Sequence, residues 1–480
     1  MTLSSKSYSP AGTAVLPSAP VDPERAHPYW TFERVARALG TGPRTLGALG
    51  GVSTDTRRIA RGDVFVALRG DHFDAHDFLV AARDAGAAAV VVSDATKAIG
   101  LGIPVYIVPD TLVALAQLAT AWRRAWGRTV IAVAGSNGKT STKELIKAAL
   151  RSSLEVHATA GNFNNLIGVP LTLLAIPANA DVAIVEVGTN APGEIARLRS
   201  IVEPNMAVLT SIGEEHLEGL GDLAGVLREE SDVFDDVDLA IVPSSQPEVA
   251  RAASGRARQV VSAGLVNADV VPTAWGLDEQ GRPWLQVDGT TLTLSLRGAH
   301  HAANAMLAIA AARACGVSVE SASIGMASMP VPHMRGVWQS IGDAILINDA
   351  YNANPASMRA ALELLSQIGG DDARQRVAIL GSMRELGPNA AGYHRDVARS
   401  ALASRADVIA VVGDFVDAFH AESPGDARVV AARELHDLWT LLEPRLARNA
   451  IVLLKASRGM ALEQLVPAIT TWATSSAATG

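Results

Sequence analysis

One segment of this sequence, residues 129–150, restricts the possible folds more than any other. Residues 129–134 are small or β-branched, which is typical of a buried strand, and residues 140–150 have the pattern of a helix. A turn with two glycines joins them. Backbone N–H groups in such a turn, together with the N-terminus of the helix behind it, form a binding site for phosphate. The predicted nucleotide-binding residues are Gly135, Ser136, Asn137, Gly138, Lys139, Thr140 and Ser141.

Two side chains of this loop strengthen the prediction. Lys139 is long enough to reach the β- and γ-phosphates of a nucleotide, and the Thr140 hydroxyl is placed to ligate Mg²⁺. The loop departs from the usual phosphate-loop pattern, because Val133 stands five positions before Gly138, where a glycine is usual. The alternative is a glycine turn with a surface lysine, and the strand and helix on either side argue against it.

Strands and helices alternate along the rest of the chain, which predicts an α/β fold with largely parallel sheets. In the central part, the pattern predicts buried strands at 181–187 and 205–210, a hairpin at 285–296 that turns at Asp288-Gly289, and a helix at 300–315. Further along, a second doubly wound sheet is predicted from strands at 344–348, 377–380, 408–412 and 451–454.

These elements group into three predicted domains after an N-terminal tail at residues 1–28. A small α/β module at 29–110 contains helices at 30–39 and 77–85 and strands at 62–68 and 87–92. A linking helix at 112–126 opens the central phosphate-loop domain, 111–330. A Rossmann-like domain follows at 331–480, after the Pro330-Val331-Pro332 boundary.

Composition excludes several classes of function. The 480 residues carry 41 Lys and Arg against 49 Asp and Glu, so no bulk positive field exists to hold nucleic acid or an anionic membrane. No apolar run has the length of a membrane span, and the N-terminus lacks the apolar core of a secretory signal. The single cysteine, Cys315, forms no internal disulfide and suits a reducing cytosol.

Two predicted strand ends carry candidate metal ligands. Glu186 ends the strand at 181–187, and His216 follows the strand at 205–210. The carboxyl ends of parallel strands meet at one edge of the sheet, where open α/β sheets bind their ligands. Both side chains are therefore candidate Mg²⁺ ligands near the phosphate loop. The alternatives are a solvated strand-end charge for Glu186 and a structural role for His216.

Two amide-rich segments are candidate binding loops. The first lies between Gly161 and Gly168, and the second follows the strand at 344–348, where the Asp349 carboxylate is suited to ribose hydroxyls. Both are equally compatible with turn formation and helix capping. The amides concerned are Asn162, Asn164, Asn165, Asn352 and Asn354.

Taken in order, these segments resemble those of the Mur ligase family, the ATP-dependent amide-forming enzymes that extend the stem peptide of peptidoglycan. The resemblance covers nearly everything after the tail. It is carried by the segments at 161–170, at 216–219 (His-Leu-Glu-Gly) and above all at 349–358 (Asp-Ala-Tyr-Asn-Ala-Asn-Pro-Ala-Ser-Met). Ser53-Thr54-Asp55-Thr56-Arg57 and residues 73–76 resemble the uridine-nucleotide module of these enzymes.

The resemblance implies an activity with ATP and two Mg²⁺. The γ-phosphoryl group of ATP would pass to the carboxylate of UDP-N-acetylmuramoyl-tripeptide, and the amine of D-alanyl-D-alanine would then displace phosphate. We expect a cytoplasmic monomer without nucleic-acid or membrane partners. A sister ligase that adds a single amino acid and a non-ligase nucleotide switch are the alternatives, and the third residue of the stem peptide stays open between meso-diaminopimelate and lysine.

The resemblance also implies roles for individual residues. One Mg²⁺ would be held by Thr140 and Glu186, and the other by His216 with a further anionic group. Asn304 would contact adenine, Asp349 the ribose, and Arg335 the transferred phosphate from the third domain, so domain closure would complete the site. Substrate contacts would come from Ser53, Thr54, Asp55, Asn162, Asn164, Asn165, Asn352 and Asn354.

Three positions depart from the family pattern. Glu230 stands where the family usually has a lysine carbamylated by CO₂, so its permanent carboxylate is predicted to support the second Mg²⁺. The alternative places Glu229 and Glu230 on a solvated helix face. If Glu230 supports the second Mg²⁺, Glu229→Gln is expected to leave the activity nearly unchanged. His301 stands where Asn is usual, and Ser382 where an acidic residue is common.

Overall fold

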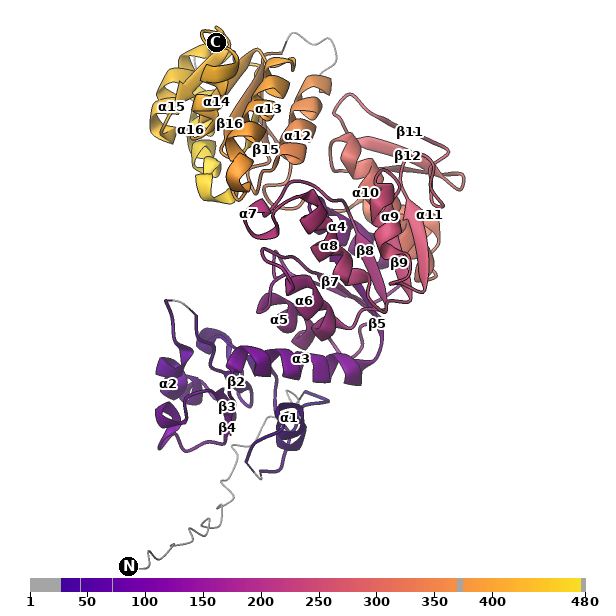
Figure 1. Ribbon diagram of the computed structural model, residues 1–480, viewed down its shortest axis with the longest axis vertical. Coiled ribbons are helices and arrows are strands. Elements are labelled where there is room, and N and C mark those ends of the chain that lie inside the picture. Colours follow the sequence, from indigo (N-terminus) through magenta and orange to yellow (C-terminus); the bar gives the residue numbers. More distant parts are fainter. Residues whose placement is uncertain (1–26, 44, 71, 369–373, 476–480) are drawn as a thin grey trace, which may run out of the picture. The chain divides into compact units, whose positions relative to one another are not determined.

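The computed structural model describes residues 27–43, 45–70, 72–368 and 374–475, so nearly all of the predicted tail lies outside the described residues (Figure 1). The chain forms two compact units. Of the described residues, the first contains those up to Gly127 together with Leu166–Ala178 and Ile201–Glu203. The second contains Arg128–Asn165, Asn179–Ser200 and the described residues from Pro204 onward.

The first unit is built on a parallel sheet with the strand order β1-β2-β3-β4. Its strands are Val52–Ser53, Val64–Val66, Ala89–Val92 and Val105–Ile107, and its helices include α1 (Phe32–Leu39), α2 (Leu79–Asp84), α3 (Thr111–Trp126) and α5 (Gly168–Leu174). The small and β-branched residues of β2 and β3 are completely buried. The predicted strands at 62–68 and 87–92 and the helix at 30–39 are thus confirmed in shortened form.

Helix α3 belongs to this first unit, whereas the sequence analysis assigned it to the central domain. It packs against α5, and the Trp122 Nε1–H donates to the carbonyl oxygen of Ile176 at 3.2 Å. The Arg123 guanidinium donates to the carbonyl of Val202 at 3.0 Å. These contacts come from segments far along the chain, so local sequence could not reveal them. A domain boundary at residue 110 remains a prediction.

The second unit contains a parallel sheet with the order β10-β9-β8-β5-β7-β6. Its strands are β5 (Thr129–Ala134), β6 (Val156–Ala158), β7 (Val182–Glu186), β8 (Met206–Leu209), β9 (Leu239–Pro243) and β10 (Gln259–Ala263). Strand β5 lies between β7 and β8, in register with both. The loops that follow these three strands therefore meet at one edge of the sheet, as predicted for the phosphate loop, Glu186 and His216.

Helices and an antiparallel hairpin complete this part of the unit. The helices are α4 (Lys139–Leu150), α6 (Glu194–Val202), α7 (Leu217–Leu220), α8 (Leu223–Ser231), α9 (Pro247–Ala253), α10 (Ala299–Ala314) and α11 (Val319–Ala327). The predicted hairpin forms between β12 (Pro283–Val287) and β13 (Thr290–Thr293) and is joined by β11 (Ala274–Leu277). Asp288 and Gly289 both have positive φ, as a two-residue hairpin turn requires.

The second six-stranded sheet of this unit has the order β14-β15-β19-β16-β17-β18. The four predicted strands are present as β15 (Ala344–Asn348), β16 (Arg376–Gly381), β17 (Val408–Val412) and β19 (Ile451–Lys455). The sequence analysis missed β14 (Val337–Ile341), which pairs antiparallel with β15, and β18 (Val429–Ala432). Both are edge strands with partly exposed side chains, so they lack the continuous apolar run that marks a central strand.

Helices α12 (Pro355–Gln367), α13 (Ala390–Leu402), α14 (Phe415–Glu422), α15 (Leu435–Leu442) and α16 (Val466–Ser475) accompany this sheet. Two apolar clusters form the core of this region, with one containing Leu380 and Phe415 and the other Leu346 and Leu438. Across the described ranges, none of the helices combines the length and the apolar character that crossing a membrane requires.

A single glycine permits the packing of α11 on α4. A Cβ atom at Gly325 would lie 1.9 Å from the carbonyl oxygen of Ala148, so the two helix backbones would have to separate. We expect Gly325→Ala to lower the free energy of unfolding by about 1–3 kcal/mol, as overpacking usually does. Ile324→Ala, on the same helix and 67% exposed, is the matched control. Equal melting temperatures for both variants in a thermal unfolding experiment would contradict the prediction.

Candidate active site

The turn after β5 has the open backbone that phosphate binding requires. Gly135 and Gly138 have φ angles of 115° and 85°, in a region that side chains disfavour. A Cβ atom at Gly135 would also lie 2.5 Å from the Thr210 hydroxyl oxygen. Helix α4 begins directly after Gly138, which provides no side-chain cap to its first turn. The helix N-terminus therefore presents N–H groups to an anion.

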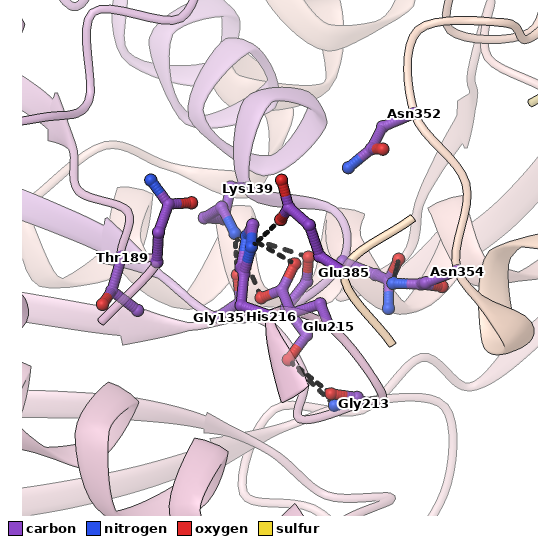
Figure 2. Close-up of polar contacts among 12 residues, drawn as sticks. Gly135, Lys139, Thr189, Gly213, Glu215, His216, Asn352, Asn354 and Glu385 are labelled. Atoms are coloured by element: carbon purple, nitrogen blue, oxygen red, sulfur yellow. Dashed lines mark hydrogen bonds and ion pairs between the residues drawn. The ribbon is translucent and has the colours of Figure 1, made fainter. Parts of the chain in front are cut away.

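The Lys139 ammonium folds back over this loop (Figure 2). It donates to the carbonyl oxygen of Gly135 at 2.5 Å and lies 3.4 Å from a carboxylate oxygen of Glu215. Burial alone would lower the pKa of Lys139, but the carboxylates of Glu215, Glu230 and Glu186 outweigh burial and raise it. Lys139 is thus a partly buried cation whose side chain is 15% exposed, rather than a surface lysine.

Glu186 is 1% exposed at the end of β7, so it is not a solvated strand-end charge. One carboxylate oxygen accepts from the Asn164 side chain at 3.0 Å. The other accepts no hydrogen bond within the described part of the chain and lies 3.9 Å from the Lys143 ammonium. The buried Thr140 hydroxyl also has no hydrogen-bond partner among the described residues.

These unsatisfied oxygens fit a hard divalent cation. Mg²⁺ takes oxygen ligands and commonly combines one or two protein groups with phosphate oxygens and water. Among the residues that the structure describes, no cluster of three or more His, Cys, Asp and Glu side chains is arranged to hold a metal without such help. The donor set of Thr140 and Glu186 therefore suits a cation that arrives with a nucleotide.

Glu229 and Glu230 are both buried in α8, with exposed fractions of 6% and 0%, so the solvated-face alternative is wrong. One oxygen of Glu230 accepts from the Gly135 N–H at 2.8 Å, directly at the phosphate loop. Its other oxygen is buried without a hydrogen-bond partner in the described ranges. Burial raises the pKa of Glu230, although the charge of Lys139 opposes the shift.

Glu229 caps the start of α6, which corrects the expectation that its replacement is nearly silent. Its carboxylate accepts from the N–H groups of Gly193 at 2.7 Å and Ile195 at 2.8 Å. It also accepts from the Thr189 hydroxyl at 3.2 Å. Replacing the carboxylate would leave buried donors unsatisfied, so Glu229 is unsuitable as a silent control.

His216 pairs with Glu385, a residue that the sequence analysis missed (Figure 2). Its Nδ1 contacts the Glu385 carboxylate, and its Nε2 lies 3.9 Å from Glu215. Both His216 and Glu385 have positive φ, a conformation that non-glycine residues rarely adopt outside special sites. Burial and the charge of Lys139 lower the pKa of His216 more than Glu385 raises it. The neutral imidazole is the form that binds metals.

The loop that follows β15 contributes residues from the second sheet. Asp349 forms an ion pair with the buried Lys455 at 2.7 Å, and the Lys455 ammonium also donates to the carbonyl of Asn352 at 2.8 Å. Asn354 caps helix α12 with its side-chain oxygen, while its side-chain amide donates to Asn137 of the phosphate loop at 2.9 Å. The Arg335 guanidinium lies over the Tyr351 ring.

Asn304 lies against the phosphate loop, since a Cβ atom at Gly138 would be 3.0 Å from its side-chain amide. His301 is one turn earlier on α10, 3.5 Å from the same amide, and 8% exposed. Burial places the pKa of His301 well below its usual value, so this ring is neutral. The neighbouring charges of His300 and Arg335 act in the same direction.

The remaining candidates have local roles in the structure. Asp55, in the first unit, caps a short 3₁₀ helix, and its pairing with Arg57 lowers the pKa of Asp55 to about 2. The Ser53 hydroxyl donates to the Asp55 carbonyl at 3.1 Å, and Thr54 is half-buried. Asn162 and Asn165 are exposed. Substrate contact by these residues stays a prediction, as it does for Asn164, Asn352 and Asn354.

Three family models match this chain in consecutive segments. The model for the Mur ligase family catalytic domain matches residues 49–123, the Mur ligase middle domain 133–312, and the Mur ligase glutamate ligase domain 335–458. The chain therefore belongs to the Mur ligase family, and the predicted family and α/β fold class are confirmed.

Within the family, the chain is similar to ligases of one kind. The UDP-N-acetylmuramoyl-tripeptide–D-alanyl-D-alanine ligase of Bacillus subtilis (strain 168) is 35% identical over 87% of this chain and 92% of its own length. The ligase of the same name from Escherichia coli (strain K12) is 34% identical over 88% of this chain and 94% of its own length. A crystal structure of MurF from Acinetobacter baumannii has a TM-score of 0.83 and 31% identity, covering 93% of this chain and 99% of that one.

The geometry of the loop gives a direct test of nucleotide binding. We expect Gly135→Ala to weaken ADP binding at least about tenfold, because the methyl group closes the turn against Thr210 and the backbone loses its positive φ. Isothermal titration calorimetry with Mg-ADP measures the effect. Gly255→Ala is the control, since Gly255 also has positive φ (84°) but nothing lies within 4 Å of its added methyl group. Equal ADP affinities for the two variants would contradict the assignment.

Proposed function

We propose that this protein is an ATP-dependent ligase that joins D-alanyl-D-alanine to UDP-N-acetylmuramoyl-tripeptide and forms ADP and phosphate. The observation that carries the proposal is the unsatisfied buried oxygens of Thr140 and Glu186 beside the Lys139 loop. In addition, ligases named for this reaction match nearly nine-tenths of this chain. Cytosolic peptidoglycan precursor synthesis is the proposed setting, and a monomer the proposed state.

The proposed reaction has two chemical steps. The stem-peptide carboxylate attacks the γ-phosphorus of ATP, so that ADP leaves and an acyl phosphate forms. The amine of D-alanyl-D-alanine then attacks the acyl carbon, loses a proton, and expels phosphate from the tetrahedral intermediate. Lys139 is the proposed cation that stabilises the negative charge on the transferred phosphoryl group, and most of the proposed rate enhancement comes from positioning and charge stabilisation.

Bound divalent cations would supply further stabilisation of the phosphate charge. Thr140 and Glu186 are the proposed ligands of one Mg²⁺. The neutral ring of His216 and the unpartnered oxygen of Glu230 are the proposed ligands of a second. Because Glu230 carries its carboxylate permanently, this site would not require the CO₂-derived group that the family usually places there.

The nucleoside would be held by helix α10 on one side and by the loop after β15 on the other. Asn304 beside Gly138 is the proposed adenine contact, with the neutral ring of His301 next to it. Asp349, oriented by Lys455, is the proposed ribose contact, and Arg335 is proposed to reach the transferred phosphate. We further propose that Ser53, Thr54 and Asp55 bind the uridine nucleotide within a domain at 29–110, followed by domains at 111–330 and 331–480.

Lys139→Ala is expected to reduce the ligation rate by about 10²–10³, because it removes a cation that acts on developing phosphate charge. Lys147→Ala is the matched control, since Lys147 lies on the same helix and pairs with Glu144. The measurement is phosphate release with both substrates, combined with mass spectrometry of the product. A Lys139→Ala enzyme that keeps more than about half of the wild-type rate would contradict the proposed role of Lys139 in phosphoryl transfer.

The same assay distinguishes the alternative functions. A ligase releases phosphate only when UDP-N-acetylmuramoyl-tripeptide and D-alanyl-D-alanine are both present, whereas a nucleotide switch hydrolyses ATP without them. A sister ligase would instead incorporate a single amino acid when amines compete. Dipeptide-dependent turnover is the expected result.

The Glu230 carboxylate leads to a prediction about CO₂. Activity should not change when bicarbonate is removed or added, and Glu230→Gln should be severely impaired because the unpartnered oxygen no longer carries charge. Short carboxylic acids should partly restore Glu230→Ala. Glu218→Gln, exposed in the neighbouring helix α7, is the control in place of Glu229. Full activity of Glu230→Gln at low Mg²⁺ would contradict the proposed role.

A further inference from the structure

Lys143 is a completely buried lysine that the proposed reaction does not use. It lies on α4, four residues after Lys139, so the two side chains share one face of the helix. Its exposed fraction is 0%, whereas lysines are almost never fully buried unless they are paired. Because removing an ammonium group from water is costly, the groups around Lys143 must stabilise its charge.

Two contacts hold the Lys143 ammonium group in place. It donates to the carbonyl oxygen of Thr159 at 2.7 Å and lies 2.9 Å from a carboxylate oxygen of Glu144. Thr159 directly follows β6 and is 1% exposed, and its hydroxyl accepts from the Glu186 N–H at 2.9 Å. One residue, Thr159, thus fixes both the ammonium group and the end of β7.

The third contact of the ammonium group is with Glu186, whose Oε2 lies 3.9 Å away. This oxygen is buried and accepts no hydrogen bond from the described residues. A distance of 3.9 Å is too long for a hydrogen bond but short enough for an ion pair. Lys143 therefore compensates the charge of Glu186 and leaves the lone pairs of Oε2 open to another group. The Asn164 amide holds the other oxygen at 3.0 Å, so the carboxylate is fixed with one oxygen free.

The charges of this network balance without a metal ion. Lys143 faces Glu144 and Glu186, and Glu144 also pairs with Lys147 at 3.2 Å. Two ammonium groups thus meet two carboxylates. A divalent cation beside Glu186 would be repelled by the nearby charge of Lys143, and buried charges interact strongly because little water screens them. Added negative charge, such as that of nucleotide phosphates, would make a cation favourable at this position.

We propose that Lys143 is the counter-ion of Glu186, which keeps this carboxylate fixed for a cation and prevents the cation from binding before the nucleotide. The inference rests on the proposed function, in which Glu186 is a Mg²⁺ ligand. Lys143 acts through Glu186 and touches neither substrate nor phosphate, so it is a positioning residue. Its effect is that cation and nucleotide enter the site together.

The test is the affinity of the nucleotide-free full chain for Mn²⁺ alone, measured by electron paramagnetic resonance. Lys143→Gln keeps an amide that can donate to Thr159 but removes the charge, so it should bind Mn²⁺ at least about tenfold more tightly than the wild type. A merely structural role of Lys143 would not create a tighter site. Combining Lys143→Gln with Glu186→Gln should abolish the added affinity. Lys147→Gln is the matched control, since Lys147 pairs with the same Glu144 but is 30% exposed, and it should keep the wild-type affinity.

The wild-type protein supplies the test if Lys143→Gln does not fold. Without nucleotide, the wild type and Glu186→Gln should bind Mn²⁺ equally weakly, whereas with ADP the wild type should bind it at least about tenfold more tightly than Glu186→Gln. The inference would be overturned by an unchanged Mn²⁺ affinity in folded Lys143→Gln, by tighter binding to the wild type than to Glu186→Gln without nucleotide, or by equal binding with ADP. The proposed function would still stand after any of these results. A wild-type protein that takes up neither ADP nor Mn²⁺ from a mixture of the two would instead contradict the proposed function.

Discussion

The arrangement of the site depends on one partly buried ammonium group, that of Lys139. Lys139 lies on a loop whose own carbonyl oxygen accepts from it, within reach of carboxylates that raise its pKa despite burial. Strand order makes this possible, because β5 has β7 on one side and β8 on the other. The ends of these strands and the loops that follow bring the lysine, Glu186 and Glu215 to one edge of the sheet, and helix α8 adds Glu230, which accepts from the Gly135 N–H. Without these acids, burial would favour the neutral amine.

The phosphate loop and the loop after β8 also make polar contacts with loops of the second six-stranded sheet in this unit. Asn137 accepts from Asn354, and His216 pairs with Glu385. Asn354 serves helix α12 as a cap while its amide reaches the phosphate loop, so one residue links local helix formation to the site. His216 and Glu385 both carry the strain of a positive φ. Strain of this kind persists only where surrounding contacts enforce it, and it occurs often at functional sites.

Much of the site was predictable, because local physical chemistry determines it. The run of small and β-branched residues at 129–134 favours a strand, and the two glycines permit the positive φ angles of the turn. Glu186 and His216 were predictable as neighbours of the loop, because parallel strands bring their carboxyl ends together. Glu215, Glu385 and Lys455 carried no such signal. Each looked like an ordinary charged residue in a loop or at a strand end. The burial of Glu215 and Lys455, and the pairing of the exposed Glu385 with His216, depend on elements distant in sequence.

Residues 229 and 230 show most clearly which features the sequence determines and which depend on tertiary structure. The sequence by itself determined that a helix here carries two adjacent acids and that a phosphate loop follows β5. It could not determine which acid faces which neighbour, because adjacent helical residues point about 100° apart and the packing of α8 sets their directions. In the structure Glu229 caps α6, and Glu230 accepts from Gly135. The tertiary structure therefore decided their roles, because only packing excludes water from both carboxylates and gives each a different set of N–H donors.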